Sequence, residues 1–201
     1  QAITDRMETE RNVFSRIPKN DYGRGGAWPF FWGALYPRGS KRIADAQLFI
    51  GIHRDCLEFG FSVGELDDKP RERFGRNLSR NRGLIGRALG EMLAAEPLDF
   101  GDRDATTPSF IEWATNPTLA PNATIRLTPE EAIEYTCNEL AQRIASVFAG
   151  LYPLVLLTLE EDPTRSVHAY LDWDEEEEQR PIQPAYPLGA CAEATGFPIG
   201  D

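Results

Sequence analysis

Two neighbouring β-prone segments constrain the fold of this chain more than any other feature. Residues 46–53 (AQLFIGIH) and 56–63 (CLEFGFSV) are rich in strand-forming residues, and Arg54 and Asp55 form a short connection between them. This pattern predicts an antiparallel hairpin. Because strand side chains repeat every two residues, we expect Phe59 and Phe61 to share one face.

Helical patterns follow the hairpin. Pro70 begins a stretch over 71–95 with apolar residues near helical spacing, and Gly83 and Gly86 predict two helices or one helix with a break. Thr128, Pro129 and Glu131 form a capping-box pattern at the start of another helix, which we expect to end at Gly150. The sequence therefore predicts an α+β fold, with an antiparallel sheet built around the central hairpin and flanked by two or more helices.

The remaining segments carry weaker patterns. We expect a weak helix over 7–17 that ends at Pro18, and a strand or packed loop over the aromatic residues 28–36. Residues 110–113 predict a short strand or buried insertion within a Pro- and Asn-rich stretch. The apolar run 152–159 predicts a buried strand, 166–173 a further short strand, and 174–178 a solvated acidic run.

Composition places the chain among ordinary globular proteins. It has 201 residues, 41% of them hydrophobic, which is enough for one sizeable core, so we expect one domain, with two small domains as the alternative. No run approaches the roughly 20 apolar residues of a membrane-spanning helix. The cysteines Cys56, Cys137 and Cys191 are an odd and widely spaced set, which is typical of a reducing compartment. We therefore expect a cytoplasmic protein with no membrane partner.

The charge is divided between the two halves of the chain. The net charge is -11, yet residues 1–90 hold 16 Lys and Arg against 11 Asp and Glu, whereas residues 91–201 hold 5 against 21. Because Lys and Arg supply most non-specific affinity for nucleic acid, the overall charge disfavours DNA and the first half favours it. An ordinary variation of surface charge explains the division equally well.

The search for catalytic chemistry finds no constellation. His53 and His168 are the two histidines, and no Gly-x-Ser-x-Gly elbow lies near either. His53 and Cys56 have the spacing of half a zinc site, but no second pair completes it, so we expect a structural histidine. Gly23, Gly25 and Gly26 match no phosphate-binding signature. We therefore expect no catalytic residue, no metal site and no cofactor in this chain.

A binding surface is the remaining hypothesis. The aromatic side chains are candidates for stacking on an unstacked base: Trp28, Phe31, Trp32 and Tyr36. The candidates for holding the phosphates are basic: Lys41, Arg42, Arg71, Arg73, Arg76 and Arg80. At helical spacing Arg73, Arg76 and Arg80 fall on one face. Aromatic clusters are more often core than binding site, because they bury so much area.

Two stretches carry a resemblance to a known family. The segment FFWGALYPRGSKRIADAQLFIGIHRDCLEFGFSVG resembles regions found ahead of McrB-type AAA+ subunits of modification-dependent restriction systems. The segment from Tyr186 to Phe197, YPLGACAEATGF, is similar to the lead-in to the nucleotide-binding core of those subunits. The resemblance implies a targeting domain over 1–180 and a linker and lead-in to an AAA+ domain over 181–201.

The same resemblance implies a function. In that family the N-terminal region recognises double-stranded DNA, commonly with a methylated or otherwise modified base, while the AAA+ portion hydrolyses nucleotide and a separate nuclease subunit cuts. We therefore expect a non-enzymatic DNA-binding specificity domain. One alternative is a protein-interaction or sensor module of the same kind of defence protein, which would use the hairpin and the acidic half. Another is a metal-dependent nuclease that uses the carboxylates near Asp172.

Overall fold

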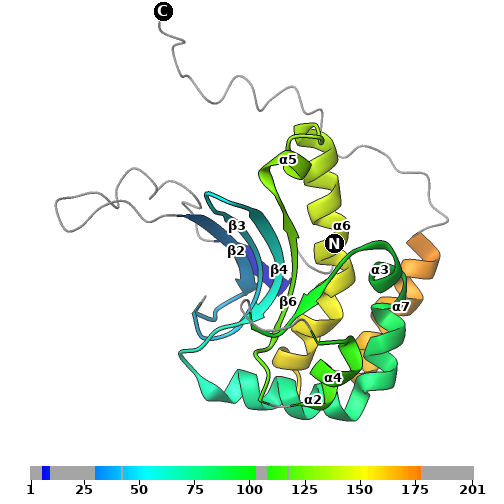
Figure 1. Ribbon diagram of the computed structural model, residues 1–201. Helices are drawn as coiled ribbons and strands as arrows, with labels where there is room; N and C mark the ends of the chain where they lie inside the picture. Colours follow the sequence, from blue (N-terminus) through cyan, green and yellow to red (C-terminus); the bar gives the residue numbers. More distant parts are fainter. Residues whose placement is uncertain (1–5, 10–29, 42, 103–107, 117, 178–201) are drawn as a thin grey trace, which may run out of the picture.

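The computed structural model describes residues 6–9, 30–41, 43–102, 108–116 and 118–177. These residues form an α+β fold, as predicted (Figure 1). The strands are β1 (Met7–Thr9), β2 (Phe31–Pro37), β3 (Ala46–Ile52), β4 (Leu57–Val63), β5 (Asp99–Phe100) and β6 (Asn122–Leu127). The helices are α2 (Asp68–Ala88), α3 (Gly90–Ala95), α4 (Phe110–Thr115), α5 (Pro129–Ala132), α6 (Cys137–Leu159) and α7 (Thr164–Glu177).

The strands form one antiparallel sheet in the order β1-β2-β3-β4-β6-β5. The predicted hairpin is confirmed, because β3 pairs with β4 from Ala46 opposite Val63 to Ile52 opposite Leu57. One face of the sheet carries Leu48, Phe59, Phe61 and Ile125, all of them fully buried. This face packs against α6, and α2 packs against α6, α4 and α7. The core therefore lies between the sheet and its helices.

Gly60 brings two strands of the sheet unusually close. A Cβ atom at Gly60 would lie 2.1 Å from the carbonyl oxygen of Ala123 and 2.8 Å from the Cα of Thr124. These atoms belong to the backbone of β6, which cannot move without breaking its pairing with β4. Only glycine fits where a neighbouring backbone approaches so closely.

The helices correct several predictions. Residues 152–159 are not a strand but the last third of α6, which continues through Gly150 to Leu159. Residues 166–173 are likewise helical, in α7. The helix capped by Thr128 and Glu131 forms with its predicted capping box but ends at Ala132, and a second capping box of Thr136 and Glu139 begins α6. The apolar run is thus a helix buried in the core, with Leu151, Leu154 and Leu157 fully buried.

Three smaller predictions also change. Residues 7–9 form β1 rather than part of a helix, and the remainder of 7–17 lies outside the described residues. Residues 110–113 belong to the helix α4, in which Trp113 is buried and Ile111 is exposed. The helical stretch over 71–95 does divide into two helices, but α2 is kinked at Asn81, ahead of the predicted glycines. The side chain of Asn81 donates to the carbonyl oxygen of Asn77 at 3.0 Å.

By length and composition, α6 is the one helix of the described residues that could cross a membrane. Half of its apolar window is buried inside the protein, and the core helix of a globular domain passes the same test. This finding is weak evidence for a membrane span.

Candidate phosphate-binding helix and sheet surface

The helix α2 carries most of the predicted phosphate-binding residues. Asp67 caps its N-terminus by accepting a hydrogen bond from the backbone of Lys69 at 3.0 Å, and Phe74, Leu78 and Ile85 fix its buried face. The arginines consequently divide between two other faces. Arg73, Arg76 and Arg80 lie toward the connection between α6 and α7, whereas Arg71 lies toward α4 and the start of β6.

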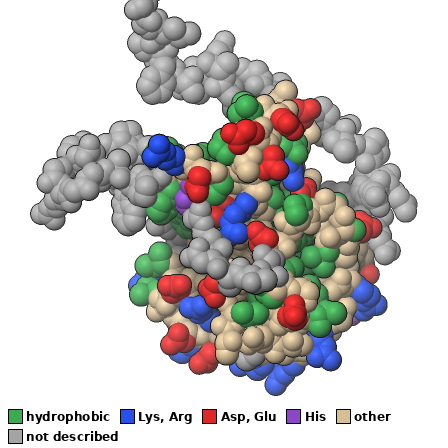
Figure 2. All heavy atoms as spheres, viewed as in Figure 1, with side chains coloured by type: hydrophobic (Ala, Val, Ile, Leu, Met, Phe, Trp, Pro, Cys, Tyr) green, Lys and Arg blue, Asp and Glu red, His purple; other side chains and the backbone are tan. Residues whose placement is uncertain are grey.

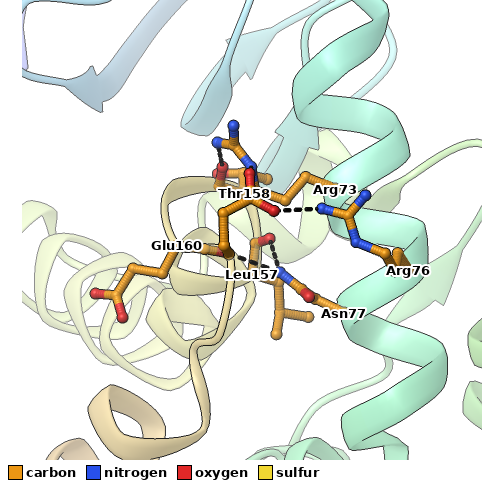
Figure 3. Close-up of polar contacts among 7 residues, drawn as sticks. Arg73, Arg76, Asn77, Leu157, Thr158 and Glu160 are labelled. Carbon is orange, nitrogen blue, oxygen red and sulfur yellow. Dashed lines mark hydrogen bonds and ion pairs between the residues drawn. The ribbon is translucent and has the colours of Figure 1, made fainter.

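Arg73 and Asn77 join α2 to the end of α6 (Figure 3). Arg73 Nη1 donates to the carbonyl oxygen of Thr158 at 2.7 Å, and Asn77 Nδ2 donates to the carbonyl oxygens of Leu157 at 3.0 Å and Glu160 at 2.8 Å. The last carbonyls of a helix have no intrahelical donor, and these two side chains supply it. Arg73 therefore has a structural role that the sequence did not indicate.

A carboxylate of the same connection pairs with two of the predicted arginines. Glu161 accepts from Arg73 Nε at 2.9 Å and from Arg76 Nη2 at 2.6 Å. Farther along, Asp162 has a pKa below its ordinary value, because Thr164 donates hydrogen bonds to it and Arg80 lies near it. Within the predicted basic face, the positive charges of Arg73 and Arg76 are thus partly neutralised by Glu161.

The second half of α2 differs. From Leu78 to Gly90 the sequence contains three arginines, Arg80, Arg82 and Arg87, and no Asp or Glu. Arg82 and Arg87 are exposed and have no hydrogen-bond or ion-pair partner among the described residues, and Arg80 is also exposed. Figure 2 shows Lys and Arg side chains gathering at the lower edge of the molecule, where α2 lies in Figure 1. Arg82 and Arg87 were not among the predicted site residues, although this acid-free run is visible in the sequence.

Gly83 lies within this exposed basic segment. A Cβ atom at Gly83 would meet nothing within 4 Å, so no contact inside the protein requires glycine there. Glycine in the interior of a helix costs about 1 kcal/mol relative to alanine. A close approach of another molecule to the helix backbone is one established reason for such a glycine.

The predicted stacking residues do not share one surface. Phe31 is 40% exposed and pairs with Ile52 on one face of the sheet, whereas Trp32 and Tyr36 are half-buried on the other face. Trp28 lies outside the described residues, as does Arg42, and Lys41 is exposed in the connection after β2. Because α2 follows the C-terminal end of β4, the Phe31 end of the sheet lies away from the start of α2.

A polar network on the sheet was missed by the sequence reasoning. His53 Nε2 lies 2.8 Å from Glu58 Oε1, and Glu58 Oε2 lies 3.5 Å from Arg126 Nε. Arg126 Nη1 donates in turn to Asp99 at 2.8 Å. The ring of Phe30 stacks on His53 with centroids 5.1 Å apart. Recognition of 122–127 as a strand would have indicated the pairing of Glu58 opposite Arg126.

The contact with Glu58 and the stacking on Phe30 give His53 a structural role that requires no metal ion. Gly51 leaves room for the imidazole, since a Cβ there would lie 3.0 Å from His53 Nε2. Within the part of the chain that the structure describes, no group of three or more His, Cys, Asp or Glu side chains could hold a metal ion. Asp172, the centre of the nuclease alternative, is exposed on α7.

No protein-family model and no curated protein matches the chain.

Proposed function

We propose that this chain is a DNA-binding specificity domain in which the second half of α2 holds the phosphate backbone. The observation that carries the proposal is the run from Leu78 to Gly90, with three arginines and no Asp or Glu. Arg80, Arg82 and Arg87 are exposed on it, and the guanidinium group is suited to phosphate because its planar fork donates two parallel hydrogen bonds.

Gly83 supports the same proposal. It lies between Arg82 and Arg87, and the space above it is open. A phosphate backbone can therefore approach the helix closely at this position, with arginines on both sides of the contact. The resemblance to McrB-type targeting regions agrees with double-stranded DNA, plain or methylated, as the ligand. Hydrolysis of nucleotide and cleavage of DNA would belong to an AAA+ domain and a nuclease subunit.

Stacking on a base is the less supported part of the proposal. Of the predicted aromatic residues described here, Phe31 is the exposed one, and it lies at the end of β2 away from the start of α2. We therefore assign the phosphate contacts to α2 and retain Phe31 as the candidate for contact with a base. Arg73 and Arg76 become secondary candidates, because Glu161 already pairs with both.

The test is binding of a labelled duplex, followed by fluorescence anisotropy at several salt concentrations, with plain, methylated and hydroxymethylated DNA. Each lost phosphate contact is expected to reduce the slope of log K against log salt by about 0.9. Arg82→Ala and Arg87→Ala are each expected to do so, whereas Arg54→Ala, at an exposed site in the β3–β4 turn, is the matched control.

A variant at Gly83 that adds bulk without changing the charge tests whether close approach to the helix matters for DNA binding. Gly83→Gln leaves the charge unchanged but fills the open space above the helix, and we expect it to weaken DNA binding. A flat salt response, or equal losses for Arg87→Ala and Arg54→Ala, would contradict the proposal.

A protein-interaction module is the second candidate function. The net charge of -11 and the pairing of Glu161 with Arg73 and Arg76 favour it, since both reduce the attraction of phosphate. This candidate predicts a stable protein complex and no response to DNA in the same anisotropy experiment.

A further inference from the structure

Arg71 lies in a groove that the proposed DNA surface does not use. A hollow of about 270 Å³ lies between α2 and the segment after α4, and a larger one of about 550 Å³ lies beside the end of β4. Both are lined by Arg71, and the segment 119–122 forms a wall of each. We call the two adjacent hollows the Arg71 groove.

The floor of the groove is apolar at both ends. Phe74 and Trp113 line the smaller hollow, and Ile43 and Leu66 line the larger one. Ile43 is 52% exposed and Leu66 is 62% exposed, although both are large aliphatic side chains. Such exposed apolar side chains at a hollow are typical of a binding surface.

Ile43 and Leu66 are held in place before any ligand binds. The backbone of Leu66 donates to the carbonyl oxygen of Ile43 at 3.0 Å, and that of Gly64 donates to Asp45 at 3.0 Å. A Cβ at Gly64 would lie 2.3 Å from the carbonyl oxygen of Ile43, so glycine permits this close approach. Because the backbone of both residues is already ordered, little backbone entropy is lost on binding.

The charges of the groove define the chemistry of its occupant. Its lining contains four carboxylates, Glu65, Asp68, Glu72 and Asp102, against the single cation Arg71. DNA is excluded from such a surface by like charge, whereas Lys and Arg side chains are complementary to it. Arg71 is half-buried and has no hydrogen-bond or ion-pair partner among the described residues. Its guanidinium can donate to a main-chain carbonyl, an acceptor that every peptide carries.

We propose that the Arg71 groove binds a basic peptide segment of a partner protein, with an apolar side chain on Ile43 and Leu66 and basic side chains against the four carboxylates. The peptide backbone passes Arg71 between the two hollows. This site is separate from the second half of α2, so the chain can hold a protein partner and DNA at different surfaces.

The probe is a labelled twelve-residue peptide of alternating lysine and leucine, with the glutamate–leucine peptide as its control. Methyl NMR spectra of the whole chain report where the probe binds. We expect saturable shifts at Ile43 and Leu66 and none at Ile111 and Ile133, which are even more exposed but line neither hollow. Equal shifts at all four positions, or no saturable shift at millimolar peptide, would overturn the proposal.

Two pairs of variants test the contacts. Leu66→Ser is expected to weaken binding of the lysine–leucine peptide about tenfold or more, whereas Ile133→Ser leaves it unchanged. Glu65→Lys is expected to weaken it as well, with Glu134→Lys as its control at another exposed glutamate. If the glutamate–leucine peptide binds as tightly, the charge argument is wrong. DNA binding is expected to survive Leu66→Ser, so failure of this proposal and of the DNA proposal are distinguishable.

Discussion

The hydroxyl group of Tyr170 donates a hydrogen bond to the carbonyl oxygen of Ala149 at 2.6 Å. Ala149 lies four residues before Pro153, which has no N–H and so cannot donate to that carbonyl within α6. The side chain of Tyr170, from α7, supplies the missing donor. This contact explains how a proline is accommodated inside the longest helix of the fold.

A double-mutant cycle tests this relationship. Tyr170→Phe is expected to lower the free energy of unfolding by about 1–2 kcal/mol, because a part-buried carbonyl loses its donor. In a Pro153→Ala background the helix can donate its own N–H, so the same substitution should cost clearly less. Urea unfolding of the four proteins measures the coupling. Equal losses in both backgrounds would show that Tyr170 does not compensate for Pro153.

Pro153 also helps to explain why the sequence wrongly predicted a strand over 152–159. Gly150 and Pro153 are ordinary signals for the end of a helix, and the apolar run over 152–159, which contains Pro153, has the length of a strand. Both signals are overridden by contacts from other elements, since Met92 packs on Gly150 and Tyr170 satisfies Ala149. Neither contact is visible in the sequence, because the partners lie 58 and 21 residues away along the chain.

Patterns formed by residues close together in the sequence, in contrast, gave correct predictions. The hairpin of β3 and β4 and the capping box of Thr128 and Glu131 depend on residues close in sequence, and both are present. The candidate site was harder to predict. Arg73, Arg76 and Arg80 were correctly placed on one helical face, but their distance from Glu161 and Asp162 depends on tertiary packing. The Arg71 groove likewise depends on packing, because its walls come from distant segments.

Asn77 is expected to be one of the most sensitive polar residues of the fold. It is 1% exposed, and its amide donates to the carbonyl oxygens of both Leu157 and Glu160. Asn77→Ala leaves both acceptors without that donor, so we expect a loss of about 2–4 kcal/mol in urea unfolding. Asn138→Ala, at an exposed position in the first turn of α6, is the control and should change stability by no more than about 0.5 kcal/mol.

Gly60 and Gly83 are expected to respond to alanine with opposite signs. Gly60→Ala places a Cβ against the β6 backbone and should destabilise the protein by about 2–3 kcal/mol or more. Gly83→Ala meets no atom and removes a flexible residue from a helix, so it should stabilise by about 0.5–1 kcal/mol. Thermal unfolding followed by circular dichroism compares the two. A stable Gly60→Ala protein would mean that β4 and β6 can separate locally.

The capping box that begins α6 makes its contribution dependent on pH. Glu139 accepts hydrogen bonds from the hydroxyl of Thr136 at 2.7 Å and from its backbone N–H at 2.8 Å, and these lower the pKa of Glu139 from its ordinary value of 4.5. A carboxylate with a lowered pKa stabilises the folded state fully above its unfolded pKa, and this stabilisation is lost as the pH falls through the lower folded value.

Glu139→Gln keeps the shape of the capping box but removes the charge. We therefore expect the Tm of the variant to be lower than that of the unmodified protein at neutral pH, and the difference to shrink as the pH falls below 4.5 and through the lowered pKa of Glu139. Glu134→Gln, at an exposed position between α5 and α6, is the control and should show no such trend. A Glu139→Gln difference that stays constant from neutral to acidic pH would show that the charge of Glu139 does not contribute to capping.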